Sequence, residues 1–111
     1  MVTQSDAGRS RSETMLRIIA DGHRQWHQSR VNAGWSRGEF DEQRKKHMLL
    51  VEDWNELPER EKNMDIAFAE LANAFIDFIE QPYRQAGMPS AMINNLTFIF
   101  FFDQFVKVRR G

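Results

Sequence analysis

The chain has 111 residues, and its 15 Lys and Arg against 16 Asp and Glu give a formal net charge of −1. This length suggests one domain with a modest core, and the balanced charge provides no overall positive field to hold nucleic acid or an anionic membrane. Cysteine is absent, which excludes disulfides, thiol nucleophiles and cysteine-ligated metals and suits a reducing compartment. We therefore expect a cytoplasmic protein with no sequence-specific nucleic-acid partner.

The N-terminal residues 1–12 are polar and contain no apolar stretch of the kind found in a signal peptide. They offer little to bury, so we expect a disordered tail. A helix is predicted to follow, with Ser12 or Thr14 as its cap and Gly34 as its terminator. Gly22 lies inside this helix, where glycine costs about 1 kcal/mol relative to alanine. A glycine at such a position indicates close approach of another group to the backbone.

A turn-rich connection then leads to the clearest predicted helix. Pro58 fits its first position, and Glu59 and Glu61 favour a helix N-terminus. Pro82 is expected to end the helix. Its apolar stripe is predicted from helical spacing to consist of Ile66, Leu71, Phe75 and Phe78 or Ile79.

The C-terminal stretch after Pro89 is dense in apolar residues but too short to span a bilayer. Its β-branched and aromatic content favours a strand, whereas a cap at Ser90 and basic residues at its end favour a helix. We favour the helix. The expected fold is mainly α with short extended segments, and residues 13–85 are expected to form the main domain and residues 86–111 an apolar C-terminal segment.

Signals of catalysis are weak. His23 and His27 have the i, i+4 spacing of metal ligands, but the glutamate of an HExxH motif is missing. No nucleophile elbow, P-loop or dinucleotide fingerprint occurs. We therefore predict a protein that is not an enzyme and that has neither a metal site nor a cofactor.

A series of short motifs runs in order along the first two thirds of the chain. These are His23-x-x-Trp26, Gly34-Trp35 with Gly38, Lys45-x-His47, Leu50-Val51, Leu57-Pro58 and Glu61-Lys62-Asn63. Residues 17–78 thereby resemble the RyR domain, the repeat first recognised in ryanodine receptors. The chain departs from the family pattern at Arg37, where the family has Tyr, at Met48, where it has Pro, and in a loop that is about one residue shorter.

The resemblance implies a compact, mainly helical and non-catalytic module. In ryanodine receptors such modules form tandem pairs, and some hold adenine nucleotides in the cleft between paired repeats. Prokaryotic relatives have been proposed to sense nucleotide signals in defence conflicts. By similarity, we expect a single-domain bacterial or phage member that senses or sequesters a nucleotide or nucleotide-derived signal.

Side-chain chemistry identifies candidate ligand-binding residues. Trp26 and Arg30 are i, i+4 and share a helix face, where an indole can stack on a base and a guanidinium can grip a phosphate. Arg37 adds positive charge, and Asp65 can accept a hydrogen bond from a base or a ribose. His23 and Trp35 complete the candidate set. The alternative is that the tryptophans are core anchors and that His23 is structural.

Five phenylalanines in the C-terminal segment exceed what one face of a helix can hide against a small domain. We predict that this segment forms the interface of a homodimer; the alternative is that it completes the core of one chain. A second candidate function is a protein-interaction or scaffold module with no small-molecule ligand. The predicted interface residues are Phe98, Phe100, Phe101, Phe102 and Phe105.

Overall fold

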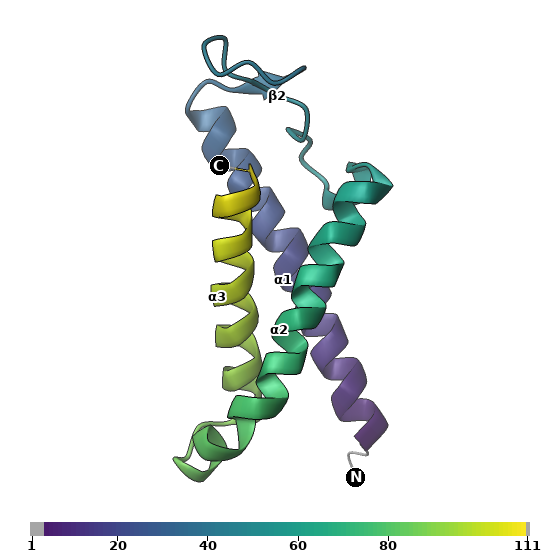
Figure 1. Cartoon of the computed structure of the whole chain (residues 1–111), viewed down its shortest axis with the longest axis vertical. Coiled ribbons are helices and arrows are strands. Elements are labelled where there is room, and N and C mark those ends of the chain that lie inside the picture. Colours follow the sequence, from purple (N-terminus) through teal and green to yellow (C-terminus); the bar gives the residue numbers. More distant parts are fainter. Residues whose placement is uncertain (1–3, 111) are drawn as a thin grey trace.

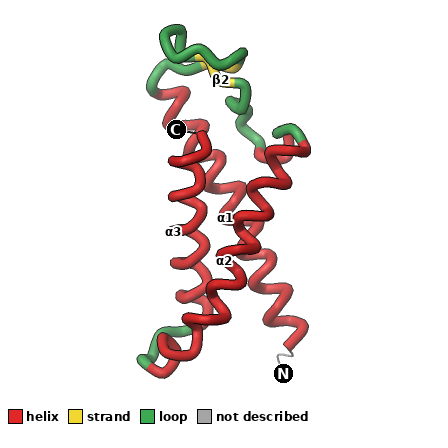
Figure 2. Tube along the Cα trace, viewed as in Figure 1, coloured by secondary structure: helices red, strands yellow, loops and turns green. Residues whose placement is uncertain are grey.

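The computed structural model describes the backbone of residues 4–110 and the side chains of residues 11–110. Within this range the fold is mainly α, as predicted, with α1 (Gln4–Asn32), α2 (Glu59–Gln85) and α3 (Ser90–Arg110) packed against one another (Figure 1). The long connection between α1 and α2 carries β1 (Ser36–Arg37), β2 (Lys46–His47) and a short 3-10 helix, η1 (Trp54–Glu56) (Figure 2). This connection and the C-terminal end of α3 lie at the same end of the molecule.

The two strands are short but fix the path of the connection. They pair in parallel, with Ser36 opposite Lys46 and Arg37 opposite His47. Gly34 has a φ of 91°, a conformation that glycine adopts without strain, and it ends α1 where the sequence predicted. The pairing brings Trp35 close to His47, with 6.4 Å between their ring centroids.

The N-terminal part of α1 differs from the prediction. The helix begins at Gln4 rather than at Ser12 or Thr14, so residues 4–12 of the expected disordered tail are helical, and residues 1–3 lie outside the described range. Arg11 explains part of the difference, because its guanidinium bonds to Asp77 at 2.8 Å and to Asn73 at 3.2 Å, both on α2. A polar contact of this kind leaves no apolar pattern in the sequence.

The packing face of α2 also differs from the predicted stripe. Of the predicted stripe, Ile66 and Ile79 pack against the core, but Leu71, Phe75 and Phe78 are exposed. The fully buried apolar residues are Ala69, Ala72 and Ile76. Small side chains let α2 approach its neighbours closely, so the bulky residues lie beside the contact rather than in it. The helix also continues through Pro82 to Gln85; proline's fixed φ suits a helix, and it removes only one hydrogen bond near the end.

The C-terminal segment is a helix, as we favoured. Phe98 and Phe102 are buried in the core of the same chain, so they cannot form the predicted interface. Phe101 and Phe105 are partly buried against α2, where Phe105 stacks on Phe68 with 4.5 Å between ring centroids. Of the five predicted interface phenylalanines, Phe100 alone is exposed.

Gly22 allows α3 to pack directly on the backbone of α1. A Cβ atom at this position would lie 2.7 Å from two ring carbons of Phe102, closer than van der Waals contact permits. The expectation of a close approach at this glycine is therefore confirmed.

We expect Gly22→Ala to lower the free energy of unfolding by about 1 kcal/mol. The better helix propensity of alanine contributes about 1 kcal/mol in favour of the variant, but crowding a buried ring costs about 1–3 kcal/mol. Urea unfolding would measure the difference. In a Phe102→Leu background the same substitution should be neutral or stabilising, and a stabilised single variant would contradict the packing argument.

Candidate functional site

A groove of about 560 Å³ runs between α1 and α3. Its charged side chains are mostly paired: Lys107 bonds to Asp103 at 3.0 Å, and Asp21 lies 3.9 Å from Arg17 and contacts Arg24. Arg30 also lines the groove, and within residues 11–110 the structure describes no carboxylate partner for it. This guanidinium is therefore the cation of the groove that is available to an anionic ligand.

Aromatic rings surround Arg30. Its guanidinium carbon lies 6.0 Å from the ring centroid of Trp26 and 5.2 Å from that of Trp35, distances at which a cation is attracted to an aromatic face. Trp35 belongs to a group of three rings with Phe40 and His47, whose centroids are 5.7 to 6.4 Å apart. We call Trp35, Phe40 and His47 the aromatic cluster. Arg30 thus joins the groove to this cluster.

The lysines of the connection are occupied by the fold. Lys45 donates to the carbonyl of Ala33 at 3.0 Å, and Lys46 donates to the hydroxyl of Ser36 at 2.8 Å. Both contacts tie the second half of the connection to the end of α1 and to β1. These ammonium groups hold the loop in place.

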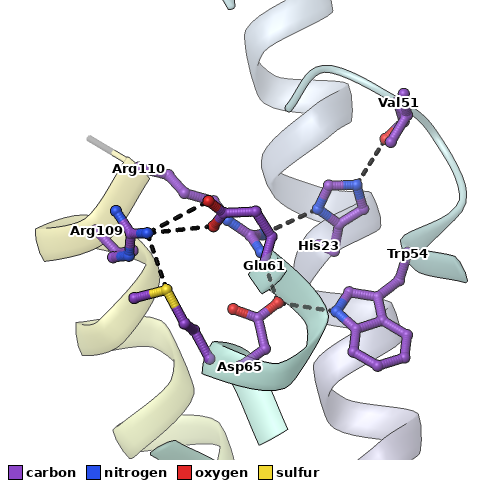
Figure 3. Close-up of polar contacts among 8 residues, drawn as sticks. His23, Val51, Trp54, Glu61, Asp65, Arg109 and Arg110 are labelled. Carbon is purple, nitrogen blue, oxygen red and sulfur yellow. Dashed lines mark hydrogen bonds and ion pairs between the residues drawn. The ribbon is translucent and has the colours of Figure 1, made fainter. Parts of the chain in front are cut away.

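His23 is fully buried and bonded at both ring nitrogens (Figure 3). Its Nε2 lies 2.6 Å from the carbonyl of Val51, and its Nδ1 lies 2.9 Å from Nη1 of Arg110. A carbonyl accepts and a guanidinium donates, so the ring must be neutral with its proton on Nε2. Burial lowers the pKa of His23 from 6.5 to about 4; the Val51 hydrogen bond opposes this shift and the Arg110 charge adds to it.

Asp65 is the second buried member of this network (Figure 3). Its Oδ2 accepts from Arg110 Nη2 at 2.5 Å and from the indole Nε1 of Trp54 at 2.8 Å. Burial raises the pKa of this carboxyl above its ordinary value, whereas the Arg110 charge and the Trp54 hydrogen bond act in the opposite direction. We call His23, Trp54, Asp65 and Arg110 the buried network; it joins α1, η1, α2 and α3.

The predicted site residues therefore separate into two groups. Trp26, Arg30 and Trp35 lie together at the end of the groove, although Trp26 is only 8% exposed, and Arg37 is exposed on the neighbouring strand. His23 and Asp65, by contrast, lie in the core with their polar groups occupied, so the structure removes them from the groove.

The sequence pattern missed Phe40 and Arg110 as members of these two groups. Phe40 belongs to no motif, and its position depends on the path of the loop. Arg110 looked like a basic residue favourable at a helix C-terminus, and nothing local indicated that it would be buried.

The same contacts explain why the sequence motifs occur together. The histidine of His-x-x-Trp bonds to Val51 of the Leu-Val motif. The tryptophan of that motif packs edge-on against His47 of Lys-x-His, with 5.0 Å between ring centroids. The His-x-x-Trp motif of α1 is thus in direct contact with both the Leu-Val and the Lys-x-His motifs of the connection.

Two kinds of feature are absent from the described part of the chain. No group of three or more His, Asp or Glu side chains in it could hold a metal ion. None of its helices combines the length and the apolar character that crossing a membrane requires.

The fold and site define a small helical module with a groove and an aromatic cluster at one end. A comparison with protein-family models matches residues 9–78 to the RyR domain, and the chain belongs to this family. Comparisons with curated proteins and with solved structures give no match. Helix α3, with Arg110, lies outside the matched residues, so one wall of the groove and one member of the buried network come from outside the family region.

Proposed function

We propose that this protein is a non-enzymatic RyR-domain module that binds a nucleotide or nucleotide-derived signal. The observation that carries the proposal is the Arg30 guanidinium, which lines the groove beside two indoles and has no described carboxylate partner. A guanidinium offers phosphate a planar, bidentate donor set. The groove volume of about 560 Å³ also falls in the range of small-molecule sites.

In this proposal the roles of the site residues differ from the expected ones. A base stacks on an open ring face, and Trp26 is too buried to offer one. Trp35 is partly exposed and Phe40 is exposed, so the aromatic cluster supplies the stacking surface in this proposal. Arg30 and the exposed Arg37 supply the positive charge. The buried ring of Trp26 helps to position the Arg30 guanidinium through a cation–π contact.

The proposal includes the wider setting that the family resemblance suggests. The protein would work in the cytoplasm of a bacterium, or from a phage genome, and would sense or sequester its ligand. It would act as a homodimer. In this proposal the protein catalyses no reaction, so ligand binding itself would be the functional output.

We expect a panel of mono-, di- and cyclic nucleotides to contain at least one that raises the melting temperature, because a ligand that binds only the folded state stabilises it. Arg30→Glu should weaken that binding roughly tenfold or more, since a charge-assisted hydrogen bond is replaced by repulsion. Isothermal titration would measure the affinities.

Arg60→Glu is the matched control, because Arg60 is exposed on α2 and the substitution changes the net charge equally. It should leave nucleotide binding unchanged. Equal affinities of the wild type and Arg30→Glu, with both proteins folded by circular dichroism, would rule out Arg30 as the anion-binding residue.

A second candidate function is a protein-interaction or scaffold module without a small-molecule ligand. The exposed phenylalanines on α2 and α3 favour it, because monomeric proteins rarely expose such large apolar groups together. A flat thermal response across the nucleotide panel would favour this function over the first.

A further inference from the structure

An apolar surface lies where α2 and α3 pack together, away from the groove that contains Arg30. We call it the α2–α3 surface and define it by exposed side chains. These are Leu71, Phe75, Phe78, Tyr83, Met92, Leu96 and Phe100. A shallow hollow of about 330 Å³ runs through it, lined by Phe75 and Tyr83 from α2 and by Leu96 and Phe100 from α3.

Helical spacing makes this surface continuous. Leu71, Phe75 and Phe78 follow one another at i, i+4 and i+7 on α2, so they occupy adjacent turns of one face. Met92, Leu96 and Phe100 do the same on α3 at i, i+4 and i+8. Phe75 of the first row and Leu96 and Phe100 of the second line the hollow, so the two rows meet there.

The surface carries almost no charge. Residues 90–102 of α3 contain no ionisable side chain, and residues 71–83 of α2, which reach Tyr83, contain only two charged side chains, Asp77 and Glu80. Both contact Arg11 of α1, at 2.8 Å and 3.5 Å respectively. A charged peptide, a nucleic acid or an anionic lipid would find no complementary group here. A second copy of the same surface would meet it without like-charge repulsion.

The exposed area matches the requirement of a stable dimer. If each of the seven side chains presents on the order of 100 Å², the surface offers roughly 700 Å². A standard interface buries about 800 Å² per partner. Aromatic residues also predominate at the centres of such interfaces, and Phe75, Phe78, Tyr83 and Phe100 supply them.

We infer that two copies of this chain associate through the α2–α3 surface about a two-fold axis, with Phe78 and Phe100 as the main anchors. The inference rests on the homodimer included in the proposed function and gives it a specific surface. The interface inferred here differs from the one predicted from the sequence. It omits Phe98 and Phe102, which are buried, and uses exposed residues of both helices. The residues lining the hollow are different from those lining the Arg30 groove, so dimerisation and ligand binding are separable.

We expect the full chain to sediment as a dimer at micromolar concentration and Phe100→Glu to raise the dimer dissociation constant roughly thirtyfold or more, as loss of a central aromatic anchor does. Phe78 is 84% exposed, so Phe78→Glu should have the same effect without disturbing the core. Phe40→Glu is the matched control, because Phe40 and Phe100 are both 62% exposed; it should leave the dimer intact.

Nucleotide titration of Phe100→Glu and of Arg30→Glu separates this inference from the proposed ligand. Phe100→Glu should keep the affinity of the wild type, whereas Arg30→Glu should lose binding but remain dimeric. A wild-type chain that stays monomeric at every concentration overturns the inference. This holds even if the monomer binds a different protein. A dimer that persists in both Phe78→Glu and Phe100→Glu also overturns it.

Discussion

Arg110→Met should lower the free energy of unfolding by about 3–5 kcal/mol, which is the usual cost of removing one partner of a buried ion pair. The side chain of Arg110 is fully buried, and it donates to Asp65 and to His23. Without it, the Asp65 carboxylate stays buried with only the Trp54 indole as a donor. Urea unfolding at one fixed protein concentration would measure the loss.

Arg109 provides a matched control one residue away. It pairs with Glu61 at 3.3 Å near the surface, and such pairs contribute about 0–1 kcal/mol. Arg109→Met should therefore cost less than about 1 kcal/mol. Adding Asp65→Asn to Arg110→Met should recover part of the loss because it removes the uncompensated charge; a double variant even less stable than Arg110→Met would contradict this account.

The buried network also connects the last turn of α3 to the groove. Arg110 in that turn is fixed by bonds to His23 of α1 and Asp65 of α2. Its guanidinium carbon lies 5.6 Å from the ring centroid of Trp26, the same indole that contacts Arg30. The position of Trp26 therefore depends on the last turn of α3, and loss of Arg110 should loosen the groove as well as the core.

Local signals were sufficient to predict the helical fold. Gly34 has the positive φ that a terminating glycine supplies, and a polar start with a basic end correctly favoured a helix for α3. The ordered motifs identified the RyR domain without any knowledge of contacts. Each of these features acts over a few residues, so the sequence displays it directly.

Interactions between distant elements could not be predicted in the same way. Arg11 pairs with Asp77 and Arg110 with Asp65 across separations of 66 and 45 residues, and no periodic pattern marks such partners. The same limit applied to α2, where Ala69 and Ala72 are buried and the predicted Leu71 and Phe78 are exposed. A hydrophobic pattern favours large apolar side chains as core residues. The distance between two packed helices, however, determines which side chains can fit between them.

The candidate site was predicted in part for the same reason. Trp26 and Arg30 are neighbours on one helix, so their proximity followed from spacing alone. Asp65 was assigned to the site because its charge suggested a solvent-facing acceptor, and its burial depends on Arg110 at the far end of the chain. The place of Phe40 in the aromatic cluster depends on the loop, whose path its sequence does not specify.

Acidification from pH 7 to pH 5 should lower the free energy of unfolding by about 2 kcal/mol through His23. His23 takes up a proton near pH 6.5 in the unfolded chain but only near pH 4 in the folded protein. Between these values the unfolded state binds more protons, so the free energy of unfolding decreases as the pH is lowered. His47, whose pKa is lowered by burial and by Arg30, acts in the same direction, and Asp65, whose pKa is raised, acts against both. Urea unfolding at pH 7, 6 and 5 would measure the slope.

His23→Gln and His27→Gln together assign that slope to one residue. The first removes the buried imidazole and should flatten the pH dependence, although it also lowers stability at pH 7. His27→Gln removes a histidine one turn away but leaves the His23 imidazole and both of its hydrogen bonds in place, so the pH dependence that His23 causes should persist. Because Nδ1 of His23 can accept from Arg110 only while it is unprotonated, acid breaks the same bond that Arg110→Met removes. The two perturbations should therefore be less than additive, and full additivity would show that His23 titrates independently of the Arg110 contact.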